Sequence, residues 1–134
     1  MGEQRLVWSG EGQSYEGFTT WGAPVAIGEA GGDGAKAADL LPLSLAACTA
    51  YDVVVILRKQ RQDLRGLEVV TTTEQEPDPP WTFTRIHQHY VLTGEIEDRK
   101  ALRAIELSES KYCAIAASLR ATVTLTHSHE IVSD

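Results

Sequence analysis

Two cysteines and two pairs of histidines are the residues with which this 134-residue chain could do chemistry. Cys48 lies at the centre of the apolar run LLPLSLAACTAYDVVVIL, residues 40–57, and Cys113 ends the segment LSESKYC. A thiolate that attacks the O–O bond of a peroxide becomes a sulfenic acid, and a nearby thiol converts that acid into a disulfide. Two cysteines therefore suffice for a redox cycle if the fold brings them together, whereas a cysteine that is merely buried is inert.

The attacking thiol must also be ionised. A neighbouring Arg, Lys, His or helix N-terminus favours the thiolate. Asp52 works against it, because at i+4 from Cys48 it lies on the same helix face, and a carboxylate raises the pKa of a thiol. The candidate cations are Arg5 and Arg85 of the same chain and Arg58 of the partner subunit in a dimer. The sequence does not place any of them beside the thiol.

The four histidines form two His-x-His pairs, His87 with His89 and His127 with His129. On a strand, the members of such a pair point to one face and offer two imidazoles to a metal such as zinc. The first pair is predicted on the strand face opposite the apolar residues of its strand. The second pair is predicted on the same face as the apolar residues of its strand. Nothing in the sequence makes the two pairs face each other, so we predict cross-strand histidines, with neither a metal nor another cofactor.

The long apolar run predicts a helix that starts with Asp39 as its N-cap and ends near Gln60. Pro42 falls in the first turn, where a missing amide proton is tolerated. Apolar residues occupy most of the circumference of the middle of this helix, so it must be covered on nearly every side. One thin sheet does not cover it, which favours a homodimer.

Strands are predicted on both sides of this helix. Alternation and turn residues place them at 6–9, 15–20, 24–27, 66–76, 83–96 and 122–132. The glycine-rich segment 28–36 reads as a loop, and two shorter helices are predicted at 98–109, with Asp98 as N-cap, and at 112–119. Because the strands are grouped rather than alternating with helices, we predict the α+β class with a mostly antiparallel sheet. The length predicts a single domain over residues 1–134.

The composition excludes two classes of partner. A net charge of -7 provides no basic surface for nucleic acid or for anionic lipid headgroups. The N-terminal segment lacks the pattern of a secretory signal, and polar residues and Pro42 interrupt the apolar run. We therefore expect a cytoplasmic protein that binds neither nucleic acid nor membrane.

Several segments together resemble the OsmC/Ohr family, in its OsmC-like branch. They are LLPLSLAAC, TAYDVVVILRKQR, GLEV, the proline-rich turn and AIELSESKYCAIAASLR, and the resemblance covers nearly the whole chain. It implies an intertwined homodimer in which sheets from both chains wrap two central long helices. It also implies that Cys48 is the peroxidatic cysteine, that Cys113 is the resolving one, and that a dithiol reductant, lipoyl or otherwise, reduces their disulfide.

The chain departs from the peroxidase members of the family at two positions. They carry an Arg in the N-terminal hairpin, where this chain offers Gln13 or Ser14, and a Glu in the first turn of the long helix, about where Ala38 stands. Asp39, one place later, could substitute by orienting an arginine, or could only cap the helix. Two hypotheses follow. The first is a thiol-dependent reductase of organic hydroperoxides that uses Cys48, Cys113 and Asp39. The alternative is a non-catalytic dimer of the same fold that binds a small apolar or thiol-reactive ligand.

Overall fold

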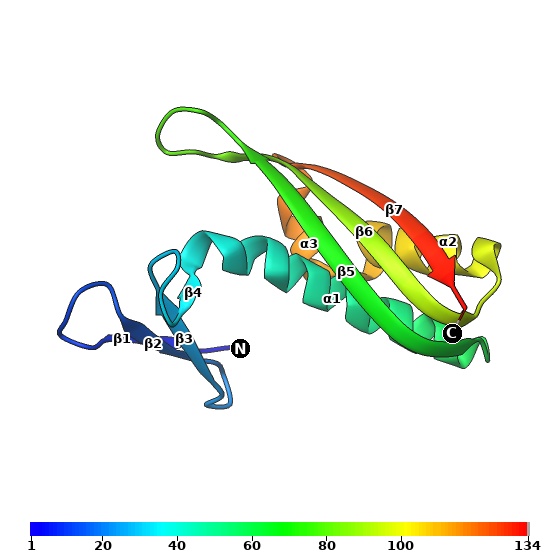
Figure 1. The fold of residues 1–134 in the computed structure, drawn as a ribbon, viewed down its shortest axis with the longest axis horizontal. Coiled ribbons are helices and arrows are strands. Elements are labelled where there is room, and N and C mark those ends of the chain that lie inside the picture. The colour runs from blue at the N-terminus through cyan, green and yellow to red at the C-terminus, as the bar shows by residue number, and fades with distance from the viewer. Residues whose placement is uncertain (134) are drawn as a thin grey trace. The chain divides into compact units, whose positions relative to one another are not determined.

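The computed structural model describes residues 1–133. The chain divides into two compact units, Met1–Leu41 as unit 1 and the residues from Pro42 onward as unit 2. Figure 1 labels the helices and strands of both units. One long helix, α1 (Ala37–Lys59), begins in unit 1 and continues in unit 2.

Unit 1 is a four-stranded sheet in the order β1 (Arg5–Trp8), β2 (Tyr15–Phe18), β3 (Pro24–Gly28) and β4 (Ala35–Lys36). The first three strands pair antiparallel, which confirms the predicted N-terminal strands. The predicted loop 28–36 is wrong at its end, because Ala35 and Lys36 pair in parallel with β3. Gly34 permits this pairing, since a Cβ atom there would lie 2.6 Å from the carbonyl carbon of Ile27.

Helix α1 confirms the predicted long helix, with two corrections at its start. It begins at Ala37, so Asp39 lies in the first turn and is not the N-cap. A carboxylate in the first turn still interacts favourably with the positive end of the helix dipole, and Arg58 and Lys59 complement the negative end. The predicted place of Pro42 in the first turn is also wrong, because in a helix that begins at Ala37 it is the sixth residue and its missing amide proton removes one intrahelical hydrogen bond.

The length and hydropathy of α1 alone would allow it to cross a membrane, a property that it shares with core helices of soluble proteins. Six of its residues are buried in unit 2, namely Pro42, Leu45, Ala46, Thr49, Val53 and Leu57. Other apolar side chains of the helix are exposed, among them Leu43 at 60% and Tyr51 at 71%. The helix therefore has one packed face and one uncovered face.

Unit 2 contains a three-stranded sheet in the order β5 (Asp63–Gln75), β6 (Phe83–Glu95) and β7 (Thr124–Val132). β5 and β6 form an antiparallel hairpin, whereas β6 and β7 run parallel. Parallel neighbours need a long crossover, and here the crossover contains the shorter helices. The predicted α+β class is confirmed, and both sheets are mixed, because β3 pairs with β4 and β6 pairs with β7 in parallel.

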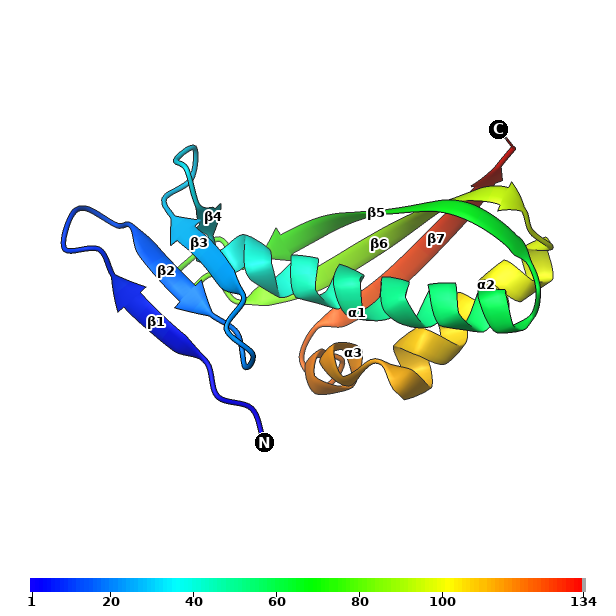
Figure 2. The same cartoon turned by 90° about the horizontal axis from the view of Figure 1, so that it is seen from below.

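The crossover between β6 and β7 consists of α2 (Asp98–Leu107), the π-helical turn η1 (Ser108–Tyr112) and α3 (Ala114–Leu119). Two details of the prediction are wrong: Glu97, rather than Asp98, is the N-cap of α2, and the helix ends before Ser108. Within unit 2, α1, α2 and α3 all lie on one face of the sheet, as Figures 1 and 2 show together.

Two apolar clusters form the core of unit 2. The first joins α1, β5, β6 and α2 through Val53, Leu57, Leu64, Tyr90, Leu92, Ala101, Ala104 and Ile105. The second, called the thiol cluster here, consists of Leu45, Ile86, Cys113, Ala116 and Val123, with Cys48 and Phe83 packed against it.

Three buried polar residues, Thr49, Gln88 and Ser108, separate these clusters and form a polar layer. Each of these polar residues lies, along its own segment of the chain, between a residue of the first cluster and a residue of the thiol cluster. Thr49 has this position on α1, Gln88 on β6, and Ser108 on the crossover. The core is therefore apolar, polar and apolar in succession along the sheet.

Candidate functional site

The structure brings the two cysteines together. Cys48 comes from α1, and Cys113 follows the π-helical turn η1 and is the N-cap residue of α3. Their side chains are in hydrogen-bonding contact, and both thiols are free. Cys113 is 2% exposed, whereas Cys48 is only partly buried. Cys48 is thus the more exposed of the two cysteine residues.

The environment of Cys113 keeps its thiol protonated. Burial, together with the hydrogen bond to Cys48, raises the pKa of Cys113 to about 11. The backbone amide of Ala116 donates to its Sγ at 3.3 Å and acts in the opposite direction, because it stabilises the thiolate. Since only a thiolate is a strong nucleophile, Cys113 is poorly suited to be the first attacking group and must lose its proton during any later step.

We expect alkylation of Cys113 in the folded protein to show this protonation directly. A pKa of about 11 leaves roughly one thousandth of the thiol ionised at pH 8, whereas a thiol with the ordinary pKa of about 8.5 is ionised to roughly a quarter. The rate of iodoacetamide modification, followed by peptide mass spectrometry, should therefore rise about tenfold per pH unit until near pH 11. Urea-unfolded protein is the control, with a midpoint near 8.5. A plateau below pH 9.5 in folded protein would contradict the prediction.

The polar layer extends from Thr49 to a carboxylate near the surface. The amide nitrogen Nε2 of Gln88 donates to Thr49 Oγ1 at 3.2 Å and to the Tyr90 hydroxyl at 3.0 Å. The Tyr90 hydroxyl in turn donates to Glu109 Oε2 at 2.7 Å. Burial, followed by the charge of Glu109, raises the pKa of Tyr90, so the phenol stays protonated.

The orientation of the Gln88 amide follows from this network. A flipped amide would point its oxygen at the Glu109 carboxylate, so Nε2 must face Tyr90 and Glu109. Within residues 1–133 this leaves Oε1 of Gln88 as a buried acceptor without a hydrogen-bond partner. A buried network with an unsatisfied member costs stability.

Asp52, the i+4 neighbour of Cys48, is engaged by another side chain. The hydroxyl of Ser108 donates to Asp52 Oδ2 at 2.7 Å. The Asp52 carboxylate is therefore held by the polar layer. Sequence reasoning placed Asp52 on the correct helix face but missed Ser108 as its partner, because the two residues are far apart in the chain.

The other residues proposed from the sequence lie apart from the thiol pair or have partners elsewhere. Asp39 is exposed in the first turn of α1, nine positions before Cys48 in the chain. Arg5 lies over the ring of Phe18 at 4.5 Å from its centroid, within unit 1. Arg85 pairs with Glu74 at 3.6 Å.

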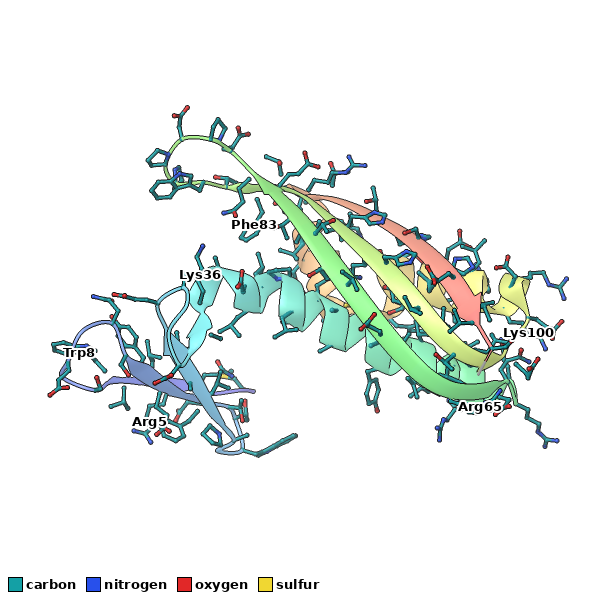
Figure 3. All side chains as sticks on the ribbon, in the orientation of Figure 1. Arg5, Trp8, Lys36, Arg65, Phe83 and Lys100 are labelled. Carbon is teal, nitrogen blue, oxygen red and sulfur yellow. The ribbon has the colours of Figure 1, made fainter. Side chains whose placement is uncertain are left out.

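Two other cations of unit 2, Arg65 and Lys100, lie at a distance from the thiol cluster. Phe83, which packs against this cluster, marks one end of the sheet, and Arg65 and Lys100 lie at the other end (Figure 3). Lys100 pairs with Glu97 at 2.9 Å. Arg58 is exposed in the last turn of α1.

The two histidine pairs lie on opposite faces of the sheet. Both ring nitrogens of His87 bond hydroxyls across the strand, those of Thr126 at 2.6 Å and Ser128 at 2.8 Å. His129 instead bonds Asp98 of α2, on the helix-covered face, at 2.8 Å. Within residues 1–133 no group of three His, Cys, Asp or Glu side chains is arranged to hold a metal ion.

Sequence reasoning missed Gln88, Tyr90 and Glu109 as a connected set. The sequence did contain one indication of this set. The alternation along β6 places Gln88 on the same apolar face as Ile86 and Tyr90. A polar residue on a buried face needs partners, and those of Gln88 come from α1, from β6 itself and from the crossover.

Comparison with known proteins fits this geometry. Residues 30–128 match the family described as OsmC-like protein, and the chain belongs to that family. It is 35% identical over 133 residues to protein YhfA of Escherichia coli (strain K12), which covers 98% of each chain. The family expectation drawn from the cysteine-bearing segments is thereby confirmed.

Solved structures share the fold. A hypothetical protein from Aquifex aeolicus VF5 superposes with a TM-score of 0.90 at 27% identity, covering 100% of this chain and 98% of that one. An organic hydroperoxide resistance protein OsmC from Legionella pneumophila has a TM-score of 0.71 at 16% identity, covering 97% and 96%. The second likeness is one of fold alone.

Proposed function

We propose that this chain is a thiol-dependent hydroperoxide reductase in which Cys48 attacks the peroxide and Cys113 resolves the product. The observation that supports the proposal is the contact between a partly exposed Cys48 and a buried, protonated Cys113. The two thiols differ in access as the two roles require. Structural neighbours named as hydroperoxide resistance proteins share the fold.

The proposed cycle has three balanced steps. The Cys48 thiolate attacks one peroxide oxygen, the O–O bond breaks, and the alkoxide leaves and takes a proton to become an alcohol. Cys113 sulfur then attacks the Cys48 sulfenic acid, and its proton leaves with the hydroxyl as water while the S–S bond forms. A dithiol reductant finally returns both cysteines to thiols and becomes a disulfide itself.

The apolar surroundings of the thiols favour an organic substrate. Cys48 and Cys113 both touch an aliphatic and aromatic cluster that contains Leu45, Ile86 and Phe83. Such a surface holds an alkyl or aryl tail while the peroxide end reaches sulfur. Asp39 is proposed to orient an arginine that stabilises the thiolate.

A cytoplasmic homodimer is the proposed working form. In unit 2 the uncovered face of α1 exposes Leu43 and Tyr51, and in unit 1 Leu6 and Trp8 are 59% and 56% exposed. Where such side chains form a contiguous apolar surface, that surface is typical of protein–protein interfaces. The single domain over residues 1–134 likewise stays a prediction.

One experiment tests the function. Reduced protein is treated with one equivalent of cumene hydroperoxide, remaining thiols are alkylated, and the intact mass is measured under denaturing conditions. The expected result is the loss of both alkylatable thiols and a disulfide that joins Cys48 to Cys113 in peptide maps. Two thiols that stay free would reject the peroxidase proposal.

A second candidate is a non-catalytic dimer that binds a small apolar or thiol-reactive ligand. The hydrogen-bond partners of the Cys113 thiol are the backbone of Ile115 and Ala116 and the Cys48 thiol, and none of them is a cation. Arg85, a candidate activator, is instead paired with Glu74. Thiols that survive peroxide but react with an electrophile such as N-ethylmaleimide at Cys48 would favour this candidate.

A further inference from the structure

A cavity that neither cysteine lines lies between the crossover and the start of β7. Its volume is about 910 Å³, and its charged lining consists of Arg103, Glu106, Glu109, Arg120 and His127. Cavities of about 300 to 1,000 Å³ hold small-molecule ligands in proteins. The two cysteines do not line it, so any ligand here is bound by other residues.

Glu109 lines the cavity with a carboxylate that is held by hydrogen bonds from buried side chains. Its Oε2 atom accepts from the Tyr90 hydroxyl at 2.7 Å, and Tyr90 is fully buried. Gln88, also buried, directs its amide nitrogen toward the same oxygen at 3.5 Å. A carboxylate held by buried donors has lost its side-chain freedom before a ligand arrives, and preorganisation of this kind increases affinity.

Arg120 presents a guanidinium group that backbone carbonyls hold in place. Its Nη1 atom donates to the carbonyl oxygens of Glu109 at 3.1 Å and Ser110 at 3.3 Å. A guanidinium carries five N–H donors in a planar fork, so donors remain for an anionic group. Within residues 1–133 neither Glu109 nor Arg120 belongs to an ion pair.

The charges of the lining are balanced. Two arginines and two glutamates face the same space, with His127 beside them. A ligand of one sign meets as many like charges as opposite ones, whereas a zwitterion can pair with both. The volume leaves room for a ligand larger than a single amino acid.

We propose that this cavity is a binding site for a zwitterionic ligand the size of a short peptide, with its ammonium group at Glu109 and its carboxylate at Arg120. The site requires no reaction of the cysteines. The proposed binding site can therefore be tested independently of the peroxidase proposal.

The test uses the reduced full-length protein and four forms of one probe. Trialanine carries both charges, N-acetyl-trialanine lacks the ammonium group, trialanine amide lacks the carboxylate, and the doubly capped peptide lacks both. Titration followed by ¹⁵N–¹H NMR should show shifts of the amide signals of Glu109 and Arg120. The dissociation constant for free trialanine should be at least tenfold lower than for either singly capped peptide.

Variants then assign each charge to its residue. Glu109→Gln keeps an oxygen for the Tyr90 hydroxyl and should bind trialanine and its N-acetyl form with equal affinity. Arg120→Gln should instead lose the discrimination between trialanine and its amide. Arg103→Gln is the matched control, because it also lines the cavity but is not anchored by the bonds that fix Arg120, and it should change affinity less than threefold.

The wild-type comparison decides the proposal even if a variant fails to fold. Equal affinity for all four peptides, shifts confined to residues outside the cavity, or no binding at millimolar concentration would overturn it. Loss of both discriminations in Arg103→Gln would also overturn the assignment to Arg120. None of these outcomes depends on whether peroxide oxidises Cys48.

Discussion

Replacing Cys48 with serine is expected to abolish hydroperoxide reduction, whereas replacing Cys113 with serine should preserve one turnover and stop the cycle there. A serine hydroxyl stays protonated at neutral pH and cannot take over the attack of a thiolate on the O–O bond. Without Cys48 we expect consumption of cumene hydroperoxide, measured with excess dithiol reductant, to fall by at least about a thousandfold, which corresponds to roughly 4 kcal/mol.

Cys113→Ser separates the two steps. Cys48 should still consume one equivalent of peroxide, and the sulfenic acid should be trapped by dimedone as a mass adduct, because no second thiol converts it to a disulfide. In the wild-type protein the adduct should be scarce. A Cys113→Ser variant that turns over at the wild-type rate would remove Cys113 from the mechanism, and a Cys48→Ser variant that retains activity would remove Cys48.

Ala114→Gly is the matched control for these variants. Ala114 is exposed and directly follows Cys113, so the substitution alters the same turn without removing a thiol. It should leave the ratio of adduct to disulfide unchanged. Circular dichroism melts of all three variants check that lost activity does not come from unfolding.

The largest effect on stability is expected from Gly94→Ala. Gly94 has a φ of +139°, which side-chain-bearing residues rarely adopt. A Cβ atom there would overlap the carbonyl oxygen of Asp63 and would lie 3.2 Å from the amide nitrogen of Arg65. Because both obstacles are backbone atoms of β5, no rotamer change relieves them. We expect a loss of more than about 4 kcal/mol in the free energy of unfolding, measured by urea denaturation.

Gly66→Ala provides the comparison for this prediction. Gly66 lies on β5 in the same hairpin, and its Cβ would lie 3.2 Å from the side-chain carbon Cβ of Thr93. It does not require the strained backbone of Gly94, so its cost should be about 1 to 2 kcal/mol. Equal denaturation midpoints for the two variants would show that the hairpin end adapts more readily than its geometry indicates.

Local signals predicted the elements of this chain well and their ends less well. The apolar run around Cys48 and the alternation in β6 depend on neighbouring residues, so they could be seen in the sequence. Asp39 and Asp98 were both expected to cap helices, yet each lies inside the first turn. An acidic residue is favourable at either place, so its type alone does not fix the boundary.

The site could be predicted only in part, because its contacts are not local. The family resemblance named both cysteines, but only the fold shows that their side chains meet. The bonds from Gln88 to Thr49 and from Tyr90 to Glu109 join α1, β6 and the crossover. No periodicity within one element indicates a partner on another, so these residues were missed.

The parallel pairing of β6 and β7 has a consequence for the order of folding. The hairpin of β5 and β6 closes over a short turn, whereas β7 can join β6 only after the chain of α2, η1 and α3 has crossed the sheet. Contacts between distant segments carry a larger loop-closure entropy and form later. Cys113 lies within that crossover and its partner Cys48 lies on α1, before the hairpin. We therefore expect the two thiols to meet late in folding, so that a nascent chain holds two separate cysteines and gains its dithiol only on reaching the native topology.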